Sequence, residues 1–206
     1  MSDLKLAYGA GEVKSSAGTP FGDQLVSALL GPYAAMAARG WLYSAYTSAV
    51  ALSLPATATI GCMVWNPPGS GVNIYLLDWA SMIHVTDADC TGVVLAAGYQ
   101  TTTPTTTTAA TFYGRLSFDQ VTAVPGAAKA YNIATVLTAP LACALLHHNT
   151  AAINTVGQEQ MSDSFKGGIL LREGAFATTA AHGAAAGTSG WTGHLIFAEV
   201  PKNVTL

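Results

Sequence analysis

Charged side chains are scarce in this 206-residue chain. Only 9% of the residues are Asp, Glu, Lys or Arg, whereas about 25% is usual in soluble domains. Half of the residues are hydrophobic, and the mean hydropathy is +0.37. A folded chain with so few charges exposes much uncharged surface, so we expect protein neighbours to cover part of it in an oligomer or a lattice.

The sequence also lacks a long apolar run. No stretch of about 18 apolar residues occurs without glycine, proline or polar interruption. The most apolar window, Ala134–Leu146, is broken by Pro140. The N-terminal residues MSDLK lack the apolar core of a secretion signal. We therefore expect no membrane partner.

Clusters of basic residues are absent as well. The eight Lys and Arg residues are scattered singly, the formal net charge is −3 and the pI is near 5.9. Because a nucleic-acid surface needs clustered Lys and Arg, nucleic acid is not an expected partner.

Cysteine is rare. Cys62, Cys90 and Cys143 are odd in number, far apart and without a CxxC pair, so neither a zinc site nor a disulfide framework is indicated. We expect free, buried thiols made in a reducing cytoplasm.

Other metal ligands are also poorly placed. His147 and His148 are adjacent, and neighbours on a strand point to opposite faces, so the pair is not arranged to hold one metal. Asp87 and Asp89 can bring two carboxylates together, but calcium takes about six to eight oxygen ligands and nothing nearby supplies them. We expect no metal and no cofactor.

Catalytic signatures are missing from the local sequence. The serines and the five histidines leave a Ser-His-Asp or Cys-His arrangement open, because such groups converge from distant positions. No Gly-x-Ser-x-Gly turn supports it. The sequence predicts a protein that is not an enzyme.

Three regions follow one another along the chain. Residues 1–22 are rich in Gly and Ser with little periodicity, which is typical of an N-terminal extended arm that orders against a neighbour. Residues 23–40 carry apolar side chains at helical spacing and predict one short helix, with Asp23 as N-cap and Gly40 in the left-handed position after its end. Gly31-Pro32 should kink this helix.

Residues 41–206 predict a single all-β domain. Alternating runs are separated by turn signals such as Asn66–Gly71 and Val124-Pro125-Gly126. About eight core strands is the jelly-roll number, so we predict a jelly-roll-like antiparallel β-sandwich; an immunoglobulin-like sandwich is the alternative. The predicted strands are Leu42–Leu54, Ala58–Trp65, Asn73–Val85, Gly92–Tyr99, Thr111–Val121, Ala130–Leu137, Leu141–His147, Phe165–Leu171, Ala175–His182 and Trp191–Val200.

The last third of the chain contains a run of small residues, Ala180–Gly190. Its glycines permit tight reversals, and Pro201 ends the strand that follows. We predict that the strands on either side of this run form a closing antiparallel pair.

A threonine-rich tract spans Gln100–Thr111. Its β-branched residues favour extended backbone, and Pro104 excludes a central strand, so an exposed loop or edge strand is predicted. Contact with a glycan through rows of hydroxyls is the alternative.

Several aromatic residues invite a sugar-platform interpretation, but packing in the core or at a subunit interface explains them more simply. They are Trp41, Tyr43, Tyr46, Trp65, Tyr75 and Trp79.

Three segments carry a family resemblance. Thr19–Val26 leads into the predicted helix and Arg39-Gly40, Asn66–Asn73 precedes a strand, and Ala184–Thr188 precedes the strand that ends at Glu199-Val200-Pro201. In this order they resemble a family of small structural proteins encoded among the head and tail genes of tailed bacteriophages.

The resemblance implies a virion protein, made in the bacterial host cytoplasm and located on the capsid surface. It implies a homotrimeric jelly roll that acts as a decoration or cement protein, binding the major capsid protein and using no small-molecule substrate. The sequence departs from the family pattern at Val72, where a basic residue is common, and at Ala198, where an aromatic is common. A tail or fibre-associated module that binds a glycan receptor is the alternative.

The residues expected to contact a partner are apolar or aromatic and lie in or near the N-terminal region. They are Leu4, Leu6, Tyr8, Phe21, Trp41 and Tyr43.

Overall fold

The computed structural model of the chain describes residues 4–8, 12–16, 33–83, 92–110, 112–115, 126–148, 159–183 and 186–204. Two compact units make up the chain, residues 1–41 and residues 42–206. The first contains a two-stranded hairpin and a short helix, and the second contains the β-sandwich.

The hairpin lies where the sequence predicts an extended arm. Strand β1 (Leu4–Tyr8) pairs antiparallel with β2 (Glu12–Ser16). Pairing of backbone groups, which side-chain periodicity does not reveal, gives this Gly- and Ser-rich region its regular structure.

The short helix α2 (Ala34–Ala38) ends as predicted at Gly40. The Gly40 backbone has φ +68° and its N–H donates to the Ala37 carbonyl, while the Trp41 N–H donates to the Met36 carbonyl. These two bonds form a Schellman motif, which uses the left-handed conformation that glycine adopts at little cost. The predicted N-cap and kink lie outside the described residues.

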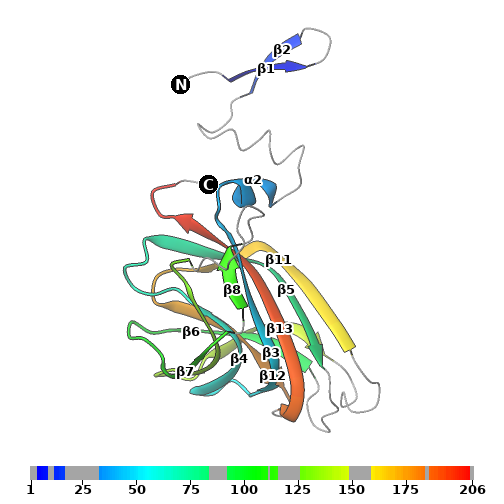
Figure 1. The fold of residues 1–206 in the computed structure, drawn as a ribbon, viewed down its shortest axis with the longest axis vertical. Coiled ribbons are helices and arrows are strands. Elements are labelled where there is room, and N and C mark those ends of the chain that lie inside the picture. Colours follow the sequence, from blue (N-terminus) through cyan, green and yellow to red (C-terminus); the bar gives the residue numbers. More distant parts are fainter. Residues whose placement is uncertain are drawn as a thin grey trace. The chain divides into compact units, whose positions relative to one another are not determined.

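The second unit is a sandwich of two antiparallel sheets (Figure 1). The five-stranded sheet has the order β11-β5-β13-β3-β8, and the six-stranded sheet has the order β10-β6-β12-β4-β9-β7. The strands are β3 (Leu42–Leu52), β4 (Ala58–Trp65), β5 (Val72–Ile83), β6 (Gly92–Tyr99), β7 (Thr105–Ala109), β8 (Phe112–Arg115), β9 (Lys129–Thr135), β10 (Leu141–His148), β11 (Glu159–Leu171), β12 (Ala175–His182) and β13 (Ala186–Pro201).

The strand order is that of a jelly roll. Without β7, β8 and β9, the sheets reduce to β11-β5-β13-β3 and β10-β6-β12-β4. The chain crosses between the two sheets at nearly every connection, which is the double Greek-key arrangement. The predicted all-β, jelly-roll-like sandwich is confirmed.

The connection between β6 and β10 adds three strands to this core. In the six-stranded sheet β9 pairs with β4 and β7 pairs with β9, while β8 pairs with β3 in the other sheet. Strands β6 and β10 adjoin at the opposite edge of the six-stranded sheet. One edge strand of that sheet, β7, therefore belongs to this connection, and the other, β10, follows directly after it.

The two sheets fill the core with side chains of different size. The aromatic side chains of the main core all come from the five-stranded sheet, and they are Tyr43, Trp79, Trp191 and Phe197. Smaller residues face them from the six-stranded sheet, including Cys62, Val64, Ala130, Ala177 and Ala181. Large side chains of one layer therefore face small ones of the other, which is an arrangement that lets the two layers interdigitate.

The six-stranded sheet is apolar on both faces. Alternate positions of its strands belong to the main core, and the positions between them form two further buried clusters. These outer clusters contain Met63, Trp65, Ala134, Val136 and Phe176 in one, and Val94, Ala96 and Ala180 in the other. The apolar residues of this sheet therefore pack on both of its faces, in the main core on one face and in the two outer clusters on the other.

The strands that flank the small-residue run near the C-terminus do not pair with each other. Strand β12 pairs with β4 and β6, whereas β13 pairs with β3 and β5 in the other sheet. The predicted closing antiparallel pair is therefore wrong. Gly183, at φ +84°, begins a connection that leads from one sheet to the other. The prediction was wrong because a turn signal shows that the chain reverses but does not show which sheet the next strand joins.

A polar network closes one end of the sandwich. The Asn66 side-chain amide donates to the carbonyls of Val72 and Leu171, at 3.0 Å each. Gln100 accepts the Leu137 N–H at 3.1 Å through its side-chain oxygen, and its backbone carbonyl accepts the Trp65 indole N–H at 3.3 Å. These bonds satisfy buried backbone groups where strands end.

A buried carboxylate fixes the entry to β9. Glu199 on β13 is buried, and its two oxygens accept the backbone N–H groups of Ala127 at 2.8 Å and Ala128 at 3.0 Å. The carboxylate lies where the Cβ of a larger residue at Gly126 would be, so a side chain there would displace it from its two N–H partners. Glu199 therefore links the five-stranded sheet to the segment that leads into β9.

Candidate functional site

The predicted partner-contact residues of the N-terminal region are placed only in part. Leu4, Leu6 and Tyr8 occupy alternate positions of β1, and Phe21 lies outside the described residues. The Arg39 guanidinium lies over the Trp41 ring, 4.9 Å from its centroid, in a cation–π contact.

Tyr43 lies in the core of the sandwich. Its exposed fraction is 4%, and its ring stacks on Phe197 with a centroid separation of 6.0 Å. A side chain buried there does not reach a partner. Trp65 and Trp79 are also buried, which confirms core packing as the explanation for these aromatic residues.

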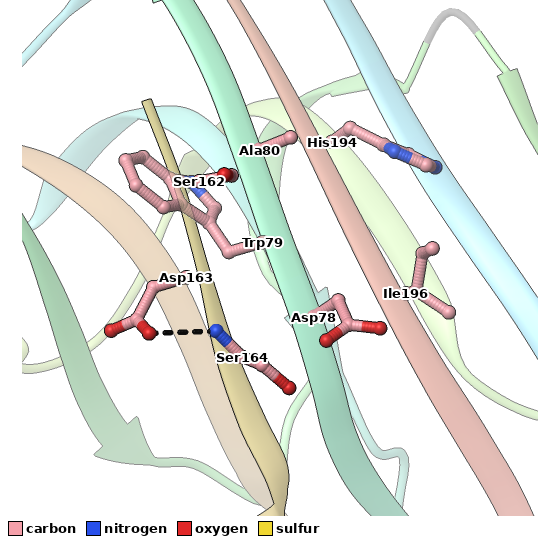
Figure 2. A pocket seen from close by; sticks show the side chains of 8 residues that line it. All are labelled: Asp78, Trp79, Ala80, Ser162, Asp163, Ser164, His194 and Ile196. Atoms are coloured by element: carbon pink, nitrogen blue, oxygen red, sulfur yellow. Dashed lines mark hydrogen bonds between the residues drawn. The ribbon is translucent and has the colours of Figure 1, made fainter. Parts of the chain in front are cut away.

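The outer face of the five-stranded sheet is hollowed into a shallow trough. Its larger part has a volume of about 510 Å³ and crosses β11, β5 and β13 (Figure 2). A smaller part of about 150 Å³ continues to Tyr46 on β3 and shares Ala80 and His194 with the first. We call this surface the outer trough; its principal side chains are Tyr46, Asp78, Ala80, Ser162, Ser164, His194 and Ile196.

Strand register explains why these residues meet. Ser162 pairs with Ala80, which pairs with His194, which pairs with Tyr46, so four strands contribute to one row. The adjacent row runs from Ser164 through Asp78 to Ile196. Side chains two positions apart on a strand share a face, so both rows lie on the outer side of the sheet.

Strand pairing is interrupted on both sides of Leu77, next to these rows. The β11–β5 register jumps between Ser164 and Ile169, and the β5–β13 register shifts between Ile196 and Phe197. Within the first, Lys166 and Gly167 have φ +51° and +76°. Bulges bend strands and increase their twist, which accounts for a hollow on this face.

The charges of the outer trough are few. Asp78 and Asp163 are its acidic residues, and among the described residues no Lys or Arg lines it. Burial lowers the pKa of His194 below its usual value, and the nearby Asp78 carboxylate opposes this shift in part. Burial therefore favours the neutral form of the imidazole.

Serine, histidine and aspartate side chains meet here, but not in the order of a nucleophilic triad. In a triad the imidazole lies between the hydroxyl and the carboxylate. Here Asp78 lies between Ser164 and the β13 strand, and Ser162 and His194 are separated by Ala80, about 10 Å apart at two strand spacings. Figure 2 shows the His194 ring turned away from Asp78.

A second surface lies along the β10 edge of the six-stranded sheet. The four most exposed large apolar side chains of the described residues lie on β10, on the turn before it and at the end of β6, with exposed fractions from 57% to 78%. We call them the apolar edge: Tyr99, Leu137, Leu141 and Leu145. Residues 92–100 and 136–148 contain no Asp, Glu, Lys or Arg.

The threonine tract forms the opposite edge of the same sheet. All five residues of β7, Thr105–Ala109, are exposed, and β7 pairs with β9. The prediction of an exposed edge strand is confirmed for Thr105–Ala109, whereas Gln100 and Pro104 of the predicted tract are buried.

The thiols differ from the prediction in one case. Cys62 is free and buried, and burial raises its thiol pKa to about 12. Cys143 is free but exposed, because it lies on edge strand β10; partial burial still raises its pKa, and its Sγ lies 3.3 Å from the Leu95 carbonyl. The prediction of a buried thiol is wrong for Cys143, and Cys90 lies outside the described residues.

The remaining predicted ligands are not brought together. His147 and His148 occupy successive positions at the end of β10, and Asp87 and Asp89 lie outside the described residues. Among the residues that the structure describes, no group of three or more His, Cys, Asp and Glu side chains is placed to hold a metal ion. Within the same residues, no helix has the length and apolarity to cross a membrane.

The residue pattern did not predict the outer trough. Asp78 and His194 are single polar residues within strongly apolar runs, and alternation alone places both on the solvent side of their strands. That signal marks the face of each residue. It does not reveal that β5 and β13 are neighbours, which depends on the crossing of the chain between sheets.

Comparisons with known proteins identify no family. No protein family matches the chain, and no curated protein matches it. The chain is similar to a solved structure described as "Structure of infectious bursal disease virus Gx strain", at 12% sequence identity and a TM-score of 0.15. The match covers 81% of this chain and 41% of that chain, so this chain spans less than half the length of the viral protein. A TM-score this low carries no argument about fold or function.

Proposed function

We propose that this chain is a non-enzymatic structural protein of a tailed-bacteriophage virion. In this proposal it forms a homotrimer, binds the outer surface of the head as a decoration or cement protein, and stabilises the lattice of the major capsid protein. The family resemblance of three sequence segments motivates the assignment.

The apolar edge is the observation that supports the proposal most directly. Exposed leucines at the side of a sheet, in segments that contain no Asp, Glu, Lys or Arg, form the kind of strand edge that pairs with another chain unless it is protected. Two register shifts along β10 are its protective features among the described residues. We therefore assign this edge to the contact between copies of the chain.

The N-terminal unit suits attachment to the head. Residues 1–41 form a compact unit separate from residues 42–206, so the hairpin belongs to a part of the chain outside the jelly-roll core. Weak contacts repeated over a lattice add up by avidity, so one such contact per subunit suffices.

Deletion of residues 1–20 tests the attachment role. We expect a folded, trimeric protein that no longer co-sediments with heads lacking it. The full chain, added to the same heads, is the control. If the truncated protein binds heads as well as the full chain does, residues 1–20 have no role in attachment.

The copy number in virions tests the proposal as a whole. Quantitative mass spectrometry of purified virions should give a copy number comparable to that of the major capsid protein. Native mass spectrometry of the isolated protein should give a trimer. Absence from the virion, or a stable monomer at micromolar concentration, contradicts the proposal.

The second candidate is a tail or fibre-associated module that binds a glycan receptor, and the outer trough favours it. This function predicts only a few copies per virion. The same mass spectrometry measurement therefore separates the two functions.

A further inference from the structure

We propose that the outer trough is a binding site for a neutral oligosaccharide, which lies across the strands from Ser164 and Asp78 to Tyr46. This inference deepens the second candidate function and rests on its glycan-binding role. A head protein can also carry such a site, so failure to bind glycans leaves the decoration role untouched.

The size and shape of the trough suit a short sugar chain. Its larger part, about 510 Å³, falls within the roughly 300–1,000 Å³ of small-ligand sites. The smaller part of about 150 Å³ extends it toward β3 through shared residues. An elongated, open hollow accepts a linear ligand whose ends continue into solvent.

The lining groups match the hydroxyls of a sugar. A carboxylate accepts hydrogen bonds from hydroxyl groups, and serine hydroxyls both donate and accept them. Asp78, Ser162 and Ser164 supply these groups from two adjacent strands, and Ser164 serves as an acceptor because its hydroxyl donates to the Leu77 carbonyl at 3.4 Å. A neutral imidazole at His194 adds one donor and one acceptor between the two parts.

Apolar groups complete the recognition surface. Ile196 lies in the row of Asp78, and Tyr46, 38% exposed, closes the far end next to His194. A tyrosine ring offers an apolar face to the C–H groups of a sugar and a hydroxyl to the surrounding water.

The charge of the trough selects a neutral ligand. Its acidic residues are not balanced by any Lys or Arg in the lining, so a carboxylate or phosphate on the ligand would meet like charge. Sialylated or uronic-acid glycans should therefore bind more weakly than neutral ones.

The backbone around the site is specialised. Lys166 adopts a left-handed conformation that is costly for a residue other than glycine, and it lies two residues after Ser164. The bulge that contains it sets where the Ser162–Ser164 segment lies against β5. Such bulges are over-represented beside binding sites because they re-aim side chains.

The test uses the full-length protein on a printed glycan array. The array carries bacterial surface oligosaccharides and common hexose, deoxyhexose and N-acetylhexosamine disaccharides, each neutral form beside an acidic form. We expect binding to one or more neutral glycans, which isothermal titration then quantifies with the soluble oligosaccharide.

Two variants locate the site. Asp78→Asn removes the charge and one acceptor, and should weaken binding about 10-fold or more. Ser162→Trp fills the trough from an exposed position and should abolish binding while the melting temperature stays close to that of the wild type. If Asp78→Asn does not fold, Ser162→Trp alone decides the outcome.

Thr107→Ala is the matched control, because it removes an exposed hydroxyl from the other sheet and tests the threonine tract as the alternative glycan surface. It should bind as the wild type does. Failure to bind any neutral glycan, a preference for acidic glycans, or loss of binding only in Thr107→Ala overturns the proposal. If Ser162→Trp instead abolishes the trimer, this face is a subunit contact and not a sugar site.

Discussion

The two edges of the six-stranded sheet contrast sharply. Strand β7 presents threonines, whose hydroxyls form hydrogen bonds with water. Strand β10 and its neighbours present leucines, which have no polar side-chain group, and the largely apolar ring of a tyrosine. Both edges are uncharged, so the difference lies in hydrogen-bonding capacity. An edge that solvent satisfies is stable alone, while an apolar edge is stabilised by a second chain.

In our proposal, this contrast assigns the contact between copies of the chain to one edge of the sheet. The connection between β6 and β10 contributes β7 at one edge and leads directly into β10 at the other. This connection thus forms one edge of the sheet with β7. In our proposal, β10 at the other edge contacts a second copy of the chain.

Changing the apolar edge should have the largest effect. Leu145→Lys places a charge where the proposal buries a leucine worth about 1.5–3 kcal/mol per subunit. We expect the trimer to dissociate to monomers at micromolar protein, measured by light scattering after size-exclusion chromatography.

Thr107→Lys on β7 is the control, and it should leave the trimer intact because β7 faces solvent. Because both positions are exposed in the single chain, neither change should alter monomer stability by more than about 0.5 kcal/mol. If the Leu145→Lys protein forms a trimer as stable as that of the wild type, β10 does not form the contact between subunits.

Weakening the Glu199 link should be the next largest effect and should act on the β7 side. Glu199→Gln replaces one of two acceptor oxygens with an amide donor facing a backbone N–H. We expect a loss of about 1–3 kcal/mol in the free energy of unfolding, measured by urea denaturation.

Glu173→Gln is the matched control. Glu173 is partly exposed, pairs with Lys202 at 2.7 Å and accepts the Gly71 N–H, so its loss should cost less than that of the buried Glu199. If both substitutions lower the free energy of unfolding equally, the buried Glu199 contacts stabilise the fold no more than the partly exposed Glu173 contacts do.

Thiol labelling sharpens the comparison without changing stability. Cys143 on β10 should react with iodoacetamide in the native protein, while Cys62, with a thiol pKa of about 12, should react only after unfolding. Peptide mass spectrometry distinguishes the two sites. If β10 forms the trimer contact, Cys143 should label more slowly in the wild type than in Leu145→Lys; equal rates would contradict it.

Acidification should give the smallest effect, and it should act on the five-stranded sheet. Because burial lowers the pKa of His194, the unfolded chain takes up the proton first as the pH falls through about 6.5. The contribution of neutral His194 to the free energy of unfolding is therefore full above pH 6.5, and it declines as the pH falls toward the pKa of His194 in the folded state. His194→Gln should flatten this dependence in thermal melts between pH 7 and 5; an unchanged pH dependence would assign it to another group.

Residue pattern alone was enough to predict most strands of the sandwich. Runs such as Ala58–Trp65 and Ala175–His182 have the same bounds in the structure, since alternation and turn residues act over a few neighbours. The pattern did not predict that β11 begins at Glu159, because the Glu159–Ser164 segment is polar and is extended by pairing with β5.

Sequence by itself determined the β-rich class, the turns and the low charge of the surface, because these follow from local composition. Only the tertiary structure decided that β12 and β13 belong to different sheets, that Tyr43 is buried while Cys143 is exposed, and that Asp78 and His194 line one trough. The physical reason is that partners in a sheet come from distant parts of the chain. Burial and proximity therefore depend on the order of the strands, which no local pattern contains.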